Sequence, residues 1–236
     1  MSGAKFAATF ERIIAAERSK ETTMKFYYFS SAPSPRKVGI VIAEKGLEIP
    51  TVIVNLREGK HRTEEFKGTN PGWTLPVLEL DDGTCITESL AMVHYLEQLY
   101  PEPNLMGIDA KEQALVLMWH DISTLEGYLG IQERYRNSLD FPEGRALPGP
   151  VSYDRIPALV DRGSRRIRAF LNKLDQRLGE SLYLAGDRYT YADIAGYVYC
   201  MFAKRVTNQD PSEGRESLTR WRDEIAARPA VLDPPG

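Results

Sequence analysis

An acid and a hydroxyl stand side by side at Glu88 and Ser89, directly before an apolar run that repeats at helical spacing. The apolar residues of this run are Leu90, Val93, Leu96 and Leu99. This spacing predicts a helix that begins near Ser89. A carboxylate there can bind an ammonium group, and a hydroxyl beside the free amides of the first helical turn can bind a carboxylate. The same two residues can also act only as a helix cap.

The segment before Glu88 predicts the elements that position this pair. The Asn-Pro-Gly sequence at 70–72 predicts a chain reversal, because Asn and Gly tolerate left-handed conformations and Pro fixes φ. Pro76 precedes the apolar stretch 77–80, and since proline cannot donate a ladder hydrogen bond it must begin that strand. The Asp-Gly pair at 82–83 predicts a tight hairpin to a second strand at 84–87.

This succession of turn, proline-headed strand, hairpin and acid–hydroxyl pair resembles the N-terminal half of the cytosolic glutathione transferases. The resemblance implies a cis bond before Pro76 and pairing of the Leu75 backbone with the cysteinyl peptide of glutathione, in the manner of an added strand. It also implies that Glu88 and Ser89 bind the γ-glutamyl end of glutathione. With the turn and hairpin in front of them, the binding interpretation is favoured over capping.

Three other residues match glutathione-binding positions of phi-class enzymes. His61 and Arg62 match a His-Lys pair that holds the glycyl carboxylate, although a loop histidine is ordinarily a solvated one. Thr74 occupies the place of a glutamine that bonds the peptide. The resemblance therefore implies glutathione as co-substrate, and the sequence predicts no metal site.

Glutathione transferases convert a bound thiol into a thiolate, and a helix N-terminus with one hydroxyl donor lowers a thiol pKa. The donor is expected between the first strand and the first helix, where Ser31 and Ser34 are equal candidates. The position that is a catalytic serine or cysteine in several classes falls on Ala32, which departs from the family pattern. Tyr28 matches the catalytic tyrosine of other classes, but a strand tyrosine is more often a core residue. Backbone amides with water are the remaining alternative.

The second substrate is expected against a long helix predicted over 111–136. Five of its residues offer apolar surface with polar tips, which suits an aromatic electrophile. They are Trp119, His120, Ser123, Tyr128 and Tyr135. Trp119 and Tyr128 could equally belong to the domain core or to a dimer surface, and His120 could order water near the sulfur.

The order of elements predicts two domains after an extension at 1–23. Residues 24–103 follow the thioredoxin-like α/β order, with strands at 25–30 and 50–55 and a helix at 36–46. The strand at 50–55 is largely apolar, which predicts burial on both faces. Residues 109–232 predict an all-helical domain, with further helices at 156–178 and 221–228. Thr190 and Asp193 predict an N-cap box that resembles the folding box of the family.

Composition excludes several classes of function. The formal net charge of the 236 residues is -3 with no basic face, so we expect no nucleic-acid partner. No apolar run approaches the ~20 residues that span a bilayer, so we expect no membrane partner. Cys85 and Cys200 suit buried positions without a redox role. The extension carries apolar residues at Phe6, Phe10 and Ile13–Ile14 but lacks the pattern of a signal or transit peptide, which predicts a cytoplasmic protein.

The sequence therefore predicts a glutathione transferase that conjugates the glutathione thiolate to an apolar or aromatic electrophile. The resemblance implies a homodimer with one site in each subunit. A glutathione-dependent reductase or lyase, including an ether-cleaving one, is the enzymatic alternative, although no cysteine follows the first strand to favour thiol exchange. A non-catalytic glutathione-binding or assembly module is the alternative from another class.

Overall fold

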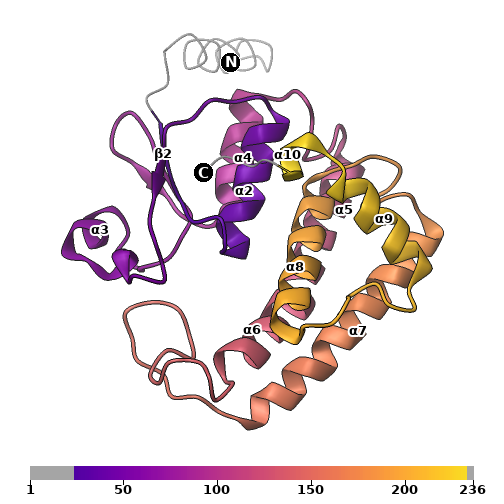
Figure 1. Cartoon of the computed structure of the whole chain (residues 1–236). Helices are drawn as coiled ribbons and strands as arrows, with labels where there is room; N and C mark the ends of the chain where they lie inside the picture. Colours follow the sequence, from indigo (N-terminus) through magenta and orange to yellow (C-terminus); the bar gives the residue numbers. More distant parts are fainter. Residues whose placement is uncertain (1–23, 233–236) are drawn as a thin grey trace.

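The computed structural model describes residues 24–232, so the predicted extension at 1–23 lies outside the described residues. The first part of the chain is an α/β unit with a four-stranded mixed sheet (Figure 1). Its elements are β1 (Lys25–Tyr28), α2 (Pro33–Glu44), β2 (Thr51–Ile53), η1 (Lys60–Arg62), α3 (Glu64–Thr69), β3 (Val77–Glu79), β4 (Cys85–Ile86) and α4 (Ser89–Leu99).

The sheet has the strand order β2-β1-β3-β4, with β1 parallel to β2 and antiparallel to β3. Helices α2 and α4 pack together, and α2 also contacts β1. Phe66 of α3 packs against Tyr27 and Val77 in a separate small core. This arrangement confirms the thioredoxin-like order that the sequence predicts.

The hairpin turn after β3 and the peptide bond before Pro76 both have the predicted form. Gly83 adopts φ +82° between β3 and β4, and the Asp82 carboxylate accepts a hydrogen bond from the Thr84 amide at 2.8 Å. The Leu75–Pro76 peptide bond is cis and directly precedes β3.

The prediction for β2 is wrong in one respect. The strand is only three residues long, and Ile53 is 55% exposed rather than covered on both faces. The physical reason is its place at the sheet edge, where it pairs with β1 alone. An apolar run in an edge strand cannot be distinguished by composition from one in a central strand.

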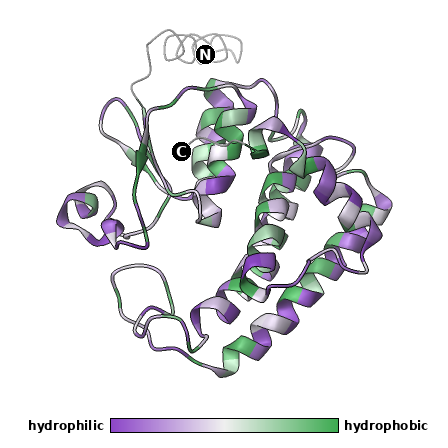
Figure 2. Ribbon diagram, viewed as in Figure 1, coloured by the Kyte–Doolittle hydropathy of each residue, from purple (hydrophilic) through white to green (hydrophobic). Residues whose placement is uncertain are grey.

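The second part of the chain is helical. Its elements are α5 (Ala110–Ile122), η2 (Ser123–Tyr128), α6 (Leu129–Arg136), α7 (Ala158–Glu180), α8 (Tyr191–Thr207), α9 (Glu216–Ala226) and α10 (Pro229–Leu232). Helix α8 is almost wholly buried and contacts α5, α6 and the α2 helix of the first part. Figure 2 shows hydrophobic residues on α2, α4 and α8, the helices that meet in the middle of the molecule. Among the described residues, no helix is long and apolar enough to cross a bilayer.

The long helix predicted over 111–136 is interrupted. Its middle turn, η2, is a π-helix, and Gly127 within it lies so close to the Phe170 ring that an added Cβ would approach the ring carbons to 2.6 Å. A π-helical turn accommodates one extra residue and often occurs at functional sites. Periodicity alone does not distinguish this turn from a regular α-helix.

The N-cap box predicted at Thr190 is confirmed. Asp193 accepts hydrogen bonds from the Thr190 and Leu184 amides and from the Trp221 indole, each at 2.9 Å. The Tyr191 amide donates to the Leu105 carbonyl at 2.8 Å, which joins the start of α8 to the segment between the two parts.

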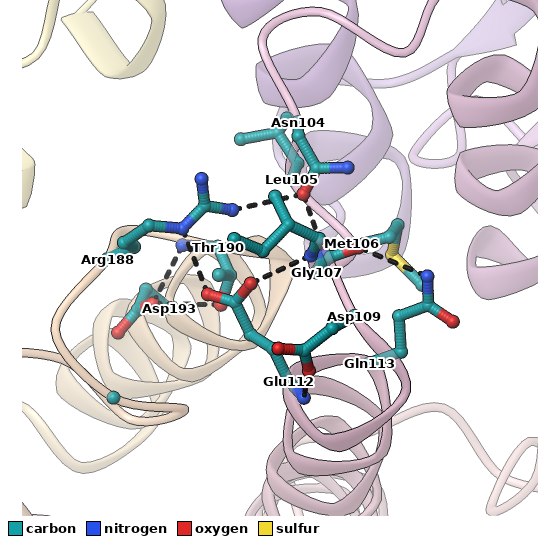
Figure 3. A network of polar contacts seen from close by, with 12 residues as sticks. Asn104, Leu105, Met106, Gly107, Asp109, Glu112, Gln113, Arg188, Thr190 and Asp193 are labelled. Carbon is teal, nitrogen blue, oxygen red and sulfur yellow. Dashed lines mark hydrogen bonds and ion pairs between the residues drawn. The ribbon is translucent and has the colours of Figure 1, made fainter.

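Charged groups on both sides hold that segment, residues 100–109, and Figure 3 shows those on the α8 side. Glu97 accepts the amides of Leu105 and Met106, and the Lys45 ammonium lies 2.8 Å from the Glu97 carboxylate. Arg188 donates to Asn104 and Glu112 from the α8 side. The two parts are therefore fixed relative to one another, while the domain limits 24–103 and 109–232 stay a prediction.

Candidate functional site

A cavity of about 920 Å³ lies between the α/β unit and the helices. It is lined by the β1–α2 connection, the segment around η1, the turn before β3, the start of α4, and the end of α6 with the loop that follows it. The predicted site residues in its lining are Ser31, Ser34, His61, Arg62, Thr74, Leu75, Pro76, Glu88, Ser89, Tyr128 and Tyr135. The structure thus brings together residues that are far apart in the sequence.

The turn before β3 presents a free backbone edge to the cavity. The buried Asn70 side chain donates to the Thr74 carbonyl at 2.9 Å and accepts the Gly72 amide at 2.9 Å. These bonds fix the turn from which Leu75 extends. No hydrogen bond joins the Leu75 backbone to another of residues 24–232. Its amide and carbonyl are therefore available to pair with an extended peptide.

The start of α4 adds an anion-binding and a cation-binding group. Glu88 has φ +66°, a left-handed conformation that costs a non-glycine residue about 1–3 kcal/mol. Its side chain makes no capping hydrogen bond and lines the cavity. The first-turn amides of α4 and the mostly buried Ser89 lie beside it. The capping interpretation of Glu88 is therefore not supported, and strain at this position is typical of a binding site.

The start of α2 offers few hydrogen-bond donors, and Ser34 holds most of them. Pro33 and Pro35 have no amide hydrogen, and the Arg36 amide donates to the Ala32 carbonyl. Ser34 supplies both an amide and a hydroxyl at this helix end, where the helix dipole favours negative charge.

Tyr128 faces Ser34 from the helical side of the cavity. Burial raises the pKa of Tyr128, while its side-chain hydrogen bonds with Gln132 and Ser34 oppose that rise. The Gln132 amide donates to the Tyr128 hydroxyl at 2.6 Å. The tyrosine ring stacks on Tyr199 with a centroid distance of 5.0 Å, which fixes its direction.

Ser31 also lines the cavity, but its hydroxyl makes no hydrogen bond with another of residues 24–232. Its carbonyl accepts a hydrogen bond from Arg205 at 2.6 Å. Of the two serines predicted as equal candidates, Ser34 has the environment better suited to stabilise an anion.

Tyr28 does not lie in the cavity lining, so the structure does not bring it together with the other catalytic candidates. Its side chain is fully buried, its ring packs 5.3 Å from that of Phe26, and an added Cβ at Gly39 would lie 3.1 Å from the ring. Burial raises the pKa of its hydroxyl. The structural reason is strand alternation, because Tyr28 points to the α2 side of the sheet.

Trp119, His120 and Ser123 are likewise buried outside the cavity lining, so the structure does not bring them together with the other site candidates. His120 stacks on Tyr191 at 5.3 Å, and burial lowers its pKa to about 4. Helical periodicity places these side chains on one face, and that face points into the core. Of the five residues predicted for the second substrate, Tyr128 at the end of the π-helical turn and Tyr135 on α6 line the cavity.

Four arginines in the lining were missed by the sequence analysis, namely Arg57, Arg136, Arg145 and Arg205. Arg136 ends α6, and Arg145 lies in the irregular loop at 137–157. The Arg136 guanidinium donates to the Arg145 carbonyl at 3.1 Å, which ties the loop to the helix. Burial, followed by the charges of Arg62, Arg145 and Arg136, lowers the pKa of His61 to about 4. The only sequence signal for Arg145 is an arginine in a loop, which by itself predicts nothing.

Two family models match the chain. One is described as the N-terminal domain of glutathione S-transferase and covers residues 32–99, and the other is described as the C-terminal domain and covers 147–229. Glutathione S-transferase 2 of Saccharomyces cerevisiae is 32% identical over 213 residues, which are 88% of each chain.

Two solved structures agree with these matches. A glutathione S-transferase domain-containing protein of Marinobacter aquaeolei superposes with a TM-score of 0.77 at 32% identity, over 88% of this chain and 99% of the other. A class Gtt2 glutathione S-transferase of Vibrio parahaemolyticus superposes with a TM-score of 0.75 at 32% identity, over 89% of this chain and 96% of the other.

Proposed function

Because this chain belongs to the glutathione S-transferase family, we propose that it conjugates the thiolate of glutathione to an aromatic electrophile. The observation that carries the proposal is the free backbone edge at Leu75, which opens into the same cavity as Glu88, Ser89 and Ser34. Together with His61 and Arg62 in the same lining, that set provides a partner for each part of the tripeptide and a donor for its sulfur.

In this proposal the Leu75 amide and carbonyl pair with the cysteinyl residue of glutathione. The Glu88 carboxylate binds the γ-glutamyl ammonium, and Ser89 with the α4 amides binds the neighbouring carboxylate. Arg62 binds the glycyl carboxylate as a cation. His61, whose pKa is lowered to about 4, binds it as a neutral hydrogen-bond donor. Thr74 keeps its structural role, because its hydroxyl and carbonyl are already bonded by Asn70.

Ser34 is the proposed donor to the sulfur. Its amide and hydroxyl hold the thiolate after the thiol proton passes to solvent, and the thiolate then attacks the electrophilic carbon. The leaving group departs with its bonding electron pair. A helix N-terminus and one donor lower a thiol pKa from its free value of about 8.5, which places thiolate in the cavity at neutral pH. Tyr128 and Gln132 orient the Ser34 hydroxyl.

The wall opposite Ser34 suits an aromatic ring. Tyr128, Tyr135, Phe141 and Phe202 all line the cavity. The Tyr135 ring lies 4.9 Å from Phe141 and 5.8 Å from Phe202, both in edge-on geometry. Such a cluster favours an aromatic substrate through stacking and burial of apolar surface.

Thiol exchange through a protein cysteine does not suit this cavity. The chain has two cysteines, and neither Cys85 nor Cys200 lines it. Burial raises the pKa of the Cys200 thiol to about 12, which keeps it protonated. We therefore favour conjugation over a cysteine-dependent reductase, and extend the proposal to a cytoplasmic homodimer.

The test is a glutathione titration of the whole chain by calorimetry at neutral pH, with ultraviolet absorbance reporting thiolate. We expect saturable binding with thiolate present, and loss of the thiolate signal with a fall in kcat of at least about tenfold in Ser34→Ala. Ser31→Ala is the matched loop control, and Tyr28→Phe is the control outside the cavity. Binding without thiolate or turnover on benzyl halides would support the non-catalytic module instead, and no binding at millimolar glutathione would refute both.

A further inference from the structure

The cavity carries more positive charge than glutathione needs. Five arginines line it, against two acids, Glu88 and Asp140. The arginines are Arg57, Arg62, Arg136, Arg145 and Arg205. Among the described residues, none of these five has a carboxylate oxygen within 4.0 Å of its guanidinium.

Most of the arginines elsewhere among the described residues are paired with an acid. Arg228 contacts Glu44 at 2.6 Å, Arg166 contacts Glu133 at 2.6 Å, and Arg222 contacts Asp210 at 2.8 Å. The contrast is therefore between two parts of one molecule. A chain with 33 acidic residues leaves the cavity arginines without acidic partners within residues 24–232.

Three of the unpaired arginines face one another across the cavity. Arg62 comes from η1 on the α/β side, whereas Arg136 and Arg145 come from the helical side and are half-buried. After burial, the charge of Arg145 is the cause that lowers the pKa of Arg62. Burial lowers the pKa of Arg136. Tyr128 and Tyr135 oppose this shift, and the charge of Arg62 adds to it. Like charges at this proximity repel, and an anion between them removes that repulsion.

The two carboxylates of glutathione already have partners in the proposed function, on which this inference rests. One is assigned to Ser89 and the other to His61 with Arg62. Arg136 and Arg145 are left without a role by that assignment.

Contacts place Arg136 on the side of the second substrate. Gln132 donates to the Tyr128 hydroxyl and accepts from the Arg136 Nε at 2.6 Å, so the guanidinium is connected to the aromatic wall. It also lies 5.2 Å from the centre of the Phe141 ring. Arg145 lies on the same side, because Arg136 donates a hydrogen bond to its carbonyl. This bond uses the Arg145 backbone. Arg145 lines the cavity, and its guanidinium makes no hydrogen bond with another described residue.

We propose that the second substrate is an aromatic electrophile that carries a carboxylate, and that Arg145 and Arg136 bind this carboxylate while the ring lies against Tyr128, Tyr135 and Phe141. A guanidinium binds a carboxylate in a bidentate geometry, so these arginines select substrates by their negative charge rather than by their size.

Direct binding tests the inference without turnover. The probes are para-toluate and para-nitrotoluene, which have similar shape and differ in charge, titrated by calorimetry into the whole chain. We expect toluate to bind at least about tenfold more tightly than nitrotoluene, and Arg145→Gln to remove most of that preference. Arg168→Gln is the matched control, since Arg168 is exposed on α7 and makes no hydrogen bond or ion pair with another described residue.

Turnover supplies the second measurement, with para-carboxybenzyl chloride and para-nitrobenzyl chloride as electrophiles. In Arg145→Gln we expect kcat/KM to fall at least about tenfold more for the carboxylate than for the nitro compound, with KM for glutathione unchanged. A rise in KM for glutathione with both electrophiles would assign Arg145 to the glutathione site and overturn the inference. Equal binding of toluate and nitrotoluene to the wild-type chain would also overturn it. If glutathione does not bind at all, the proposed function fails, and the toluate preference still decides this inference.

Discussion

The segment between the two domains and the rim of the cavity are both rich in charge, yet they treat charge in opposite ways. Beside the segment at 100–109, Lys45 is paired with Glu97 and donates to the Tyr100 and Pro103 carbonyls. Arg188 donates to Asn104 and Glu112 on the other side (Figure 3). At the cavity rim, Arg62, Arg136 and Arg145 face one another without a carboxylate among the described residues. Charges that hold the fold are satisfied within the chain, whereas charges for a ligand are left unsatisfied until it binds.

The largest effect is expected at Asp193, the most heavily bonded acid near the segment. Burial raises its pKa to about 6, so the carboxylate is ionised at neutral pH. Asp193→Ala leaves the Leu184 and Thr190 amides and the Trp221 indole without their acceptor, and should lower the free energy of unfolding by about 4 kcal/mol in urea denaturation. Arg188→Gln breaks a partly exposed pair in the same network and should cost less than about 1 kcal/mol. Equal losses of stability in Asp193→Ala and Arg188→Gln would mean that the burial of Asp193 does not make its removal more costly.

The buried pair in the segment should give the next largest effect. Glu97→Gln leaves the Lys45 ammonium buried without its counter-charge, and should lower the free energy of unfolding by about 3 kcal/mol. Glu102→Gln is the control, since Glu102 is exposed on the same segment. Urea denaturation of both variants at one pH provides the measurement. A Glu97→Gln protein as stable as the Glu102→Gln protein would show that the carbonyls of Tyr100 and Pro103 suffice for Lys45.

His61 and His120 sharpen the comparison, because both have a pKa lowered to about 4 but face different charged groups. Burial is the first cause for each, but only His61 also faces three arginines of the rim. An anion bound at the rim offsets their charge and favours the protonated ring, so saturating glutathione should raise the His61 pKa by about 1 unit. The pKa of His120 should stay unchanged. NMR titration of the ring signals, assigned with His61→Gln, checks both, and an equal shift of the two would contradict a local anion.

Local turn chemistry made much of the fold predictable from the sequence. The Asn-Pro-Gly turn, the Asp-Gly hairpin and the Thr190 N-cap box each depend on residues within a few positions of one another. The free edge at Leu75 and the pair at Glu88–Ser89 follow from the same local signals, so these parts of the candidate site were also accessible.

The rest of the site depends on contacts between distant segments. Periodicity shows which side chains share a helix face but not whether that face meets a core or a cavity, which is why Trp119 and His120 were assigned to the second substrate. Ser34 and Ser31 differ only through what Tyr128 and Arg205 bring to them from the other domain. Arg145 belongs to the site because Arg136 holds its loop, and no spacing rule encodes that contact.

The smallest effect has the opposite sign to the first two. Arg145→Gln removes one of the mutually repelling cations of the rim, so the ligand-free protein should become more stable by about 0.5 kcal/mol. The gain should shrink at high salt, because salt screens partly exposed charges. Arg155→Gln in the same loop is the matched control, since Arg155 binds the Ser138 and Leu139 carbonyls and pairs with Glu143.

Urea denaturation of these two loop variants at low and high salt separates the two kinds of charge. Arg155→Gln should lose stability at both salt concentrations, because hydrogen bonds to carbonyls depend little on screening. A loss in Arg145→Gln equal to that in Arg155→Gln would mean that Arg145 holds the loop as Arg155 does. The rim would then follow the same rule as the segment at 100–109, with its charge satisfied inside the chain.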